Sequence, residues 1–268
     1  MIEPYYSKDG ITVYCADAKD VIDSIEHIDC IITSPPYNLM NRKGGGVSGG
    51  GGIHKNSNWS KKAINGWAGE IEDMQEQEYQ IWLVDLLGIY FEKCKGLMWV
   101  NHKIRYVDGI AIHPARFLPW DIHSEVIWNR NSSMALNCRR YPPSHEYFLG
   151  FGKPYYWDNK NDNLMSVWTK CYELRKHDHP CPFPIEFINR LILSSTREGD
   201  VVVDPFAGSG TTLVSAKKNN RKVIGIEKQE KYCELIVNRL AQNYLSFDEE
   251  EEEEGCLVNP QQETAIAS

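Results

Sequence analysis

The stretch most suggestive of chemistry is TSPPYN at residues 33–38, directly after the apolar segment IDCII at residues 28–32. Two consecutive prolines remove two backbone donors and fix φ, so the chain must leave a sheet here as a stiff, extended turn. The turn presents the hydroxyl of Ser34, the carbonyl of Pro35 and the ring of Tyr37 in a fixed order. Whatever chemistry occurs here must use a rigid hydroxyl, carbonyls and an aromatic ring together.

A second segment, VVVDPFAGSGTT at residues 201–212, predicts a ligand site. An apolar strand that ends at an acid and passes through small residues into a helix lets a ligand approach the backbone at the carboxyl edge of a sheet. Gly208 and Gly210 permit the tight turn, and the helix amino terminus behind them can face a carboxylate. The segment is neither Gly-x-Gly-x-x-Gly nor a phosphate-binding loop. It therefore predicts a cofactor that lacks a pyrophosphate.

An acid at the tip of the next strand completes this prediction. Sixteen residues beyond Thr211, the segment VIGIEKQ carries Glu227, placed where a carboxylate binds a ribose diol. A cofactor with a ribose, a charged amino-acid end and no pyrophosphate is S-adenosylmethionine. We therefore expect S-adenosylmethionine as the cofactor.

Four segments resemble those of one known family, the DNA amino-methyltransferases, which act on exocyclic amines. TSPPYN resembles their catalytic motif and DPFAGSGTT their cofactor loop, while HPCPFP at 179–184 and HEYFLGFGK at 145–153 are similar to two further shared segments. The resemblance spans roughly residues 11–37 and 145–245. The catalytic motif precedes the cofactor loop, which is the permuted order of the family's β group.

The resemblance implies a mechanism for the proline-rich turn. An exocyclic amine of cytosine or adenine is a poor nucleophile, because its lone pair is delocalised into the ring. The Ser34 hydroxyl and the Pro35 carbonyl would accept hydrogen bonds from the two N–H groups of the amine, so that the lone pair of its nitrogen points at the methyl group of the cofactor. Pro36 would stiffen the turn, and Tyr37 would stack on the base once it is flipped out of the duplex.

The resemblance also implies a cofactor site. Glu227 would hold the ribose, Asp17 would contact the adenine amine, and Phe183 would pack near the cofactor, with plain core packing as the alternative for Phe183. The loop that follows Asp204 would hold the methionine end. The predicted cofactor-binding residues are Asp17, Phe183, Asp204, Phe206, Ala207, Gly208, Ser209, Gly210, Thr211 and Glu227.

The identity of Ser34 bears on the target base. In the family, Ser-Pro-Pro-Tyr is associated more with cytosine N4, and Asp-Pro-Pro-Tyr more with adenine N6. The ending Tyr-Asn, here Tyr37-Asn38, is commonly seen in the form of the motif that begins with aspartate, so adenine is the alternative to cytosine. Further alternatives are an RNA or protein amide methyltransferase, whose Pro-Pro-Tyr turn follows the cofactor loop, and a non-catalytic DNA-binding relative, which would be expected to lack Ser34 or Tyr37.

Basic residues predict contact with double-stranded DNA. Residues 38–69 carry five bases and no Asp or Glu, around the flexible run GGGVSGGGG at 44–52. Residues 100–145 carry six bases against three acids. The predicted DNA contacts are Arg42, Lys43, Lys55, Lys61, Lys62, Arg130, Arg139 and Arg140.

Composition predicts a soluble protein in the cytoplasm, and the resemblance implies an enzyme that associates with DNA there. The net charge of −8 over 268 residues comes mostly from DEEEEEE at 248–254, because the other 30 acids nearly balance 29 bases. Eight cysteines without a Cys-x-x-Cys pair suggest neither a metal site nor a disulfide framework. No apolar run is long enough to cross a membrane. A homodimer and a restriction endonuclease partner are further candidates for association.

Alternating strands and helices at both ends predict an α/β fold with a mostly parallel, doubly wound sheet. The resemblance implies that this sheet is Rossmann-like, of the class I methyltransferase type, with one antiparallel strand. Strands are expected at 11–15, 28–33, 97–101, 123–128, 145–151 and 222–227, and residues 201–210 are expected to be a strand that runs into a glycine turn. Helices are expected at 17–25, 74–94, 184–195, 211–219 and 229–244. The expected organisation is a catalytic domain from 1–37 and 145–247 with a helix and strand at 70–101, a flexible loop at 38–69, a target-recognition region at 102–144 and a disordered acidic tail at 248–268.

Overall fold

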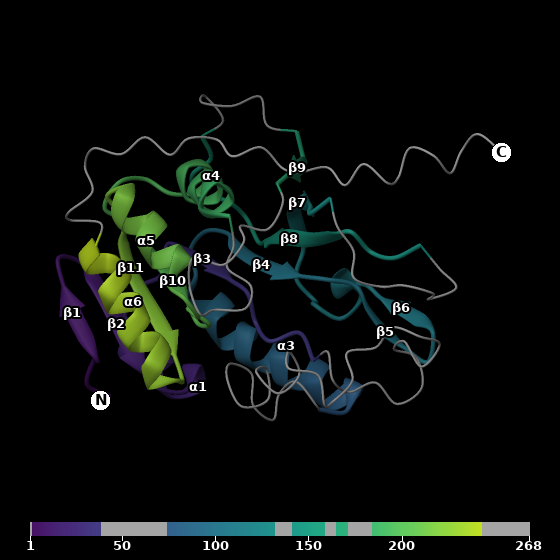
Figure 1. Cartoon of the computed structure of the whole chain (residues 1–268), viewed down its shortest axis with the longest axis horizontal. Helices are drawn as coiled ribbons and strands as arrows, with labels where there is room; N and C mark the ends of the chain where they lie inside the picture. The colour runs from purple at the N-terminus through teal and green to yellow at the C-terminus, as the bar shows by residue number, and fades with distance from the viewer. Residues whose placement is uncertain (1, 39–73, 132–140, 159–164, 171–183, 243–268) are drawn as a thin grey trace.

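A computed structural model describes residues 2–38, 74–131, 141–158, 165–170 and 184–242 of the chain (Figure 1). Within these ranges the strands of the main sheet lie in the order β1-β2-β11-β10-β3-β4-β8-β7-β9. Their bounds are β1 Tyr6–Lys8, β2 Ile11–Cys15, β3 Cys30–Thr33, β4 Met98–His102, β7 Ile122–Asn129, β8 His145–Phe151, β9 Val167–Thr169, β10 Val201–Asp204 and β11 Lys222–Glu227. A separate hairpin pairs β5 Arg105–Val107 with β6 Ile110–Ile112.

The sheet is mostly parallel, as predicted. Strands β2, β11, β10, β3 and β4 pair in parallel, one beside the next. Two described strands oppose this direction where one was expected. Strand β8 is antiparallel to both β4 and β7, and the short edge strand β1 is antiparallel to β2. A three-residue edge strand has too little alternation to be detected from sequence, and this accounts for the missed β1.

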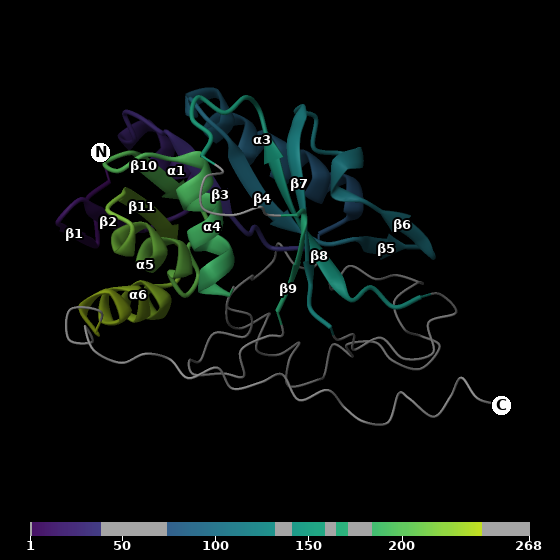
Figure 2. The same cartoon turned by 90° about the horizontal axis from the view of Figure 1, so that it is seen from above.

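Helices cover both faces of the sheet, as Figure 2 shows from above. Helices α1 and α3 lie on one face, and α4, α5 and α6 lie on the other. The bounds of the helical elements are α1 Ala18–Val21, η1 Ile22–Ser24, α3 Glu76–Lys93, η3 Pro114–Arg116, α4 Ile185–Ser195, α5 Thr211–Lys218 and α6 Glu230–Gln242. Among the described residues, no helix has the length and apolar character needed to cross a bilayer.

Two hydrophobic cores follow from the strand period of two. On β3, Cys30 and Ile32 pack in the core beneath α4, α5 and α6, while Ile31 packs on the other face with Leu83 and Tyr90 of α3. A parallel strand buried on both faces is rich in apolar residues on both sides, and this is why the apolar residues of IDCII predicted a strand. The consequence is that β3 is held on both faces up to the residue where the proline-rich turn begins.

Parts of the predicted organisation lie outside the described residues, namely most of the loop at 38–69 and the tail at 248–268. Within the region expected to serve target recognition, 102–144, the structure forms the β5–β6 hairpin and also β7, which pairs with β8 in the main sheet. The functional division of the chain stays a prediction.

The glycine at position 150 of β8 is required by the ring of Trp99, its partner on β4. A Cβ at Gly150 would lie 2.8 Å from Cζ3 of the fully buried Trp99. We expect Gly150→Ala to lower the free energy of unfolding by about 1–3 kcal/mol through overpacking.

The matched control is Gly88→Ala in helix α3, where the nearest heavy atom is Cζ2 of Trp120, 3.8 Å away. This change should raise the free energy of unfolding by about 0.5–1 kcal/mol, because alanine loses less backbone entropy in a helix. Urea denaturation measures both variants. A Gly150→Ala protein as stable as the wild type would contradict the packing described for β4 and β8.

Candidate active site

The carboxyl ends of neighbouring parallel strands bring the predicted motifs to one edge of the sheet. Strand β3 ends at Thr33 and runs into the proline-rich turn, and β10, its neighbour, ends at Asp204. The Thr33 hydroxyl donates to Oδ1 of Asp204 at 2.9 Å, between residues 171 positions apart. The start of the proline-rich turn and the predicted cofactor loop are therefore joined directly by a buried hydrogen bond.

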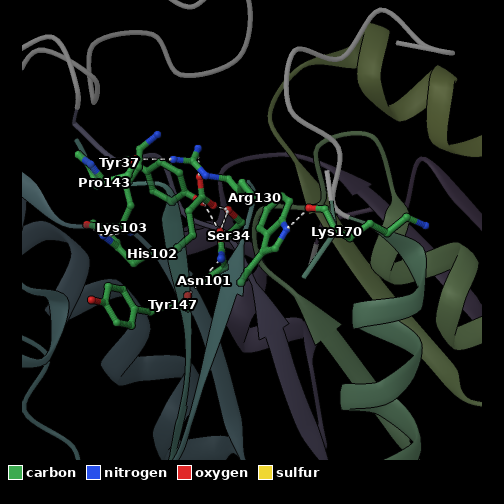
Figure 3. Close-up of polar contacts among 11 residues, drawn as sticks. Ser34, Tyr37, Asn101, His102, Lys103, Arg130, Pro143, Tyr147 and Lys170 are labelled. Atoms are coloured by element: carbon green, nitrogen blue, oxygen red, sulfur yellow. Dashed lines mark hydrogen bonds and ion pairs between the residues drawn. The ribbon is translucent and has the colours of Figure 1, made fainter. Parts of the chain in front are cut away.

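Two hydroxyls of the proline-rich turn meet at a single amide oxygen (Figure 3). Oγ of Ser34 lies 2.8 Å from Oη of Tyr37, and either oxygen can donate to the other. Ser34 donates to Oδ1 of Asn101 at 3.3 Å, and the Tyr37 hydroxyl also donates to this atom. The structure thus brings together Ser34 and Tyr37, as predicted, around a residue that the sequence interpretation did not include.

The orientation of Asn101 is fixed by the sheet. This residue lies in β4 with no exposed surface, and its Nδ2 donates to the carbonyl of Tyr147 on β8 at 3.1 Å. Because the amide nitrogen is committed to that carbonyl, the oxygen must face the two hydroxyls. Asn101 therefore presents a fixed acceptor to the turn.

A buried ion pair lies behind the Tyr37 hydroxyl. Oε2 of Glu146, on β8, accepts a hydrogen bond from Tyr37 at 3.4 Å, and Oε1 of Glu146 pairs with Nη1 of Arg130 at 3.1 Å. Nη2 of Arg130 also donates to the carbonyl of Pro143. The Glu146 side chain is 3% exposed and that of Arg130 is 14% exposed. Arg130, predicted as a DNA contact, therefore points into this cluster in the structure.

The proline-rich turn is also held from beneath. The Tyr79 hydroxyl of α3 donates to the carbonyl of Pro36 at 2.6 Å and lies 2.9 Å from Nε2 of His102. Burial lowers the pKa of His102 to about 3, so the ring is neutral. Its Nδ1 accepts from the backbone N–H of Lys103, and its Nε2 then donates to Tyr79. This chain of hydrogen bonds fixes the position of the turn.

The predicted cofactor loop forms a tight turn between β10 and α5. Gly210 has φ of +81° and precedes the first residue of α5, and Gly208 has φ of +52°. A Cβ at Gly210 would lie 2.8 Å from Cγ1 of Ile236, so the position requires glycine for its space as well as its backbone angle. The turn between the strand and the helix is therefore compact, and it depends on glycine at position 210.

Two acids flank this loop. Oδ1 of Asp204 accepts from the backbone N–H of Phe206 at 3.0 Å, and burial raises the pKa of Asp204 to about 6. Glu227, at the end of β11, accepts from the backbone N–H groups of Gly208 at 3.1 Å and Gln229 at 2.8 Å. Burial raises the pKa of Glu227 to about 7 against these two hydrogen bonds. The carboxylate of Glu227 therefore gains from any additional hydrogen-bond donor.

Asp17 lies next to Glu227. The carbonyl of Glu227 accepts from the backbone N–H of Ala16, which places Asp17 beside the end of β11. Oδ1 of Asp17 caps α1 by accepting from the N–H of Lys19 at 3.1 Å, and Oδ2 pairs with Lys228 at 3.3 Å. Phe206 packs against Trp82, with 6.0 Å between ring centroids.

The remaining predicted residues cannot be placed. Phe183, Arg42, Lys43, Lys55, Lys61, Lys62, Arg139 and Arg140 lie outside the described residues. Sequence reasoning did not identify Asn101, Glu146, Tyr79 or His102 as site residues. The resemblance did include HEYFLGFGK, whose second residue is Glu146, and this was the available signal for that acid.

The sequence of the chain matches a family model and several known proteins. A family model described as DNA methylase matches residues 28–238. The chain is 31% identical over 274 residues to the type II methyltransferase M2.LlaDCHI of Lactococcus lactis subsp. cremoris, with 90% of this chain and 93% of the relative covered.

Solved structures share the fold. The PvuII DNA methyltransferase, described as cytosine-N4-specific, has a TM-score of 0.66 at 18% identity over 89% of each chain. The complex of M1.HpyAVI with SAM has a TM-score of 0.55 at 21% identity, over 86% of this chain and 100% of the other. The fold is that of the class I methyltransferases. The chain itself belongs to the DNA methylase family.

The raised pKa of Glu227 predicts a pH-dependent stability. A glutamate in the unfolded chain has a pKa of about 4.3, so between about pH 4.5 and 7 the folded state binds more protons. Stability from this group is therefore greatest below pH 4.5 and is lost as the pH rises through 7. Glu227→Gln lacks this dependence.

Relative to the wild type, the Glu227→Gln variant should gain on the order of 2 kcal/mol of stability between pH 5 and pH 8. Urea denaturation of both proteins at the two pH values measures the change, and effects common to both proteins cancel. If the stability difference is the same at the two pH values, the pKa of Glu227 is not raised.

Proposed function

We propose that this protein transfers a methyl group from S-adenosylmethionine to the exocyclic amine of a base flipped out of double-stranded DNA, and that this base is cytosine, modified at N4. The observation that carries the proposal is the Ser34 hydroxyl, held at the end of β3 by Tyr37 and Asn101 and joined through Thr33 to the acid of the cofactor loop. Membership of the DNA methylase family supports DNA as the substrate.

The residues around the glycine turn fit S-adenosylmethionine. Glu227 is a largely buried carboxylate that accepts hydrogen bonds from the backbone N–H groups of Gly208 and Gln229, so ribose hydroxyls would supply further donors that favour its charged form. The amino terminus of α5 and the backbone of residues 207–211 would hold the methionine end, and Asp17 the adenine amine. The bound cofactor supplies an electrophilic methyl group.

The proline-rich turn would activate the amine. The Ser34 hydroxyl and the Pro35 carbonyl would accept hydrogen bonds from the two N–H groups of the amine. The turn is held in place because the Tyr79 hydroxyl donates a hydrogen bond to the carbonyl of Pro36. Positioning of this kind lowers the barrier without a strong base, because the reacting groups are already aligned. The Tyr37 ring would support the flipped base.

The choice of cytosine over adenine rests on serine at position 34. The feature that favoured adenine, asparagine after Tyr37, has a local explanation. Asn38 is buried with φ of +54°, a conformation that asparagine tolerates better than most residues, and its Nδ2 donates to the carbonyl of Met74 at 2.9 Å. Asn38 thus serves the backbone of the turn, and its presence does not argue for adenine.

Two kinds of partner belong to the same proposal. The relative M2.LlaDCHI is named a type II methyltransferase, and by analogy we propose that this chain protects DNA from a restriction endonuclease. A second copy of the chain is the other proposed partner. The basic residues predicted to contact DNA remain predictions.

The test is methyl transfer to unmodified plasmid DNA, followed by digestion to nucleosides and mass spectrometry. The wild type should yield N4-methylcytosine. Ser34→Ala should lower the yield by about 100-fold or more through loss of one amine acceptor, with cofactor affinity by calorimetry within about twofold of the wild type.

Each result has a distinct meaning. N6-methyladenine as the product would establish the alternative base and overturn the cytosine assignment. Full activity of the Ser34→Ala protein would overturn the catalytic role of Ser34. Absence of any methylated nucleoside with the wild type would contradict the proposed function itself.

A further inference from the structure

We propose that Glu146, held by Arg130, is a positioning residue that acts through Tyr37 to turn the Ser34 hydroxyl into a hydrogen-bond acceptor for the target amine. The inference rests on the proposed function, because it explains how a neutral serine performs the task assigned to it there. It also gives Arg130 a role within the site in place of the predicted contact with DNA.

The chemical requirement comes from the hydroxyl itself. Ser34 carries one proton and two lone pairs, whereas an ionised carboxylate carries only lone pairs. If the hydroxyl proton points at the amine, it faces the proton of an N–H group, and the oxygen cannot accept a hydrogen bond from that group. Ser34 can therefore act as an acceptor toward the base only if its own proton is bound elsewhere.

The structure supplies two acceptors for the proton of each hydroxyl. Ser34 can donate to Oη of Tyr37, 2.8 Å away, or to Oδ1 of Asn101, 3.3 Å away. Tyr37 can in turn donate to Oδ1 of Asn101 or to Oε2 of Glu146. Asn101 alone is a single amide oxygen shared by two hydroxyls. The carboxylate of Glu146 adds a second acceptor, so that both protons can be directed away from the base.

Charge increases the effect. A carboxylate that accepts from Tyr37 polarises its hydroxyl, and hydrogen bonds in such a chain reinforce one another in a buried site. Arg130 pairs with the other oxygen of Glu146 and so orients the carboxylate edge toward Tyr37. The result is greater negative character at Oγ of Ser34, which makes this oxygen a better acceptor for the amine.

The burial of the pair is consistent with this role. An ion pair with 3% and 14% of its side chains exposed gains little stability, because desolvation offsets most of the attraction. Glu146 also lies on β8, directly before Tyr147, whose carbonyl orients Asn101. One short segment of β8 therefore controls both acceptors that the hydroxyls use.

A double-mutant cycle in single-turnover methyl transfer tests the proposal, with DNA that the wild type methylates. Tyr37→Phe keeps the ring and removes the hydroxyl, and Glu146→Gln keeps the shape and removes the charge. Each single variant should slow transfer by about 10-fold or more, and the double variant should be no slower than Tyr37→Phe, because the two residues act in one chain.

Two further measurements on Tyr37→Phe and one control variant separate this role from a structural one. Cofactor affinity and thermal unfolding should change little in Tyr37→Phe. The control Asp29→Asn alters a buried carboxylate directly before β3, at the opposite end of the strand from Ser34, and should transfer methyl within about twofold of the wild-type rate.

Three results would overturn the proposal while the wild type remains active. They are a Glu146→Gln rate within twofold of the wild type, losses that multiply in the double variant, and a wild-type rate in Tyr37→Phe. The last of these decides the question even if Glu146→Gln does not fold. An inactive wild type would instead contradict the proposed function.

Discussion

A hydroxyl accepts hydrogen bonds from an amine only when its own proton is bound elsewhere, and the proposed active site is organised around this constraint. Ser34 meets it through Tyr37 and Asn101, which lie within hydrogen-bonding distance of its oxygen. Each of these partners depends on another element, since β8 orients Asn101 and α3 holds the turn through Tyr79. The chemistry therefore depends on the packing of the whole central sheet.

The parallel sheet makes this arrangement economical. Strands β3 and β10 end at the same edge, so the proline-rich turn and the proposed cofactor loop meet without long connections. The hydrogen bond from Thr33 to Asp204 joins them across 171 residues of sequence. The antiparallel strand β8 then approaches from the other side of β4 and places Glu146 near the turn. The edge between β10 and β8 therefore holds both halves of the proposed reaction.

The features predictable from sequence were those encoded locally. Apolar runs located the central strands, and the turn and loop motifs located Ser34 and Glu227, because rigid prolines and small residues leave clear patterns. Asn101 and Glu146 were missed because they reach the turn from 64 and 109 residues beyond Tyr37. The ion pair of Arg130 was also missed, because a count of charges cannot show that a buried carboxylate 16 residues away pairs with it.

The most direct test of the central claim is a crystal structure of the complex with methylatable DNA and a non-reactive cofactor analogue. The flipped base should place its amine nitrogen about 3 Å from Oγ of Ser34 and from the Pro35 carbonyl, with the bond between Ser34 and Tyr37 retained. An amine bound by other groups, or a Ser34 hydroxyl turned away from both the base and Tyr37, would contradict the account.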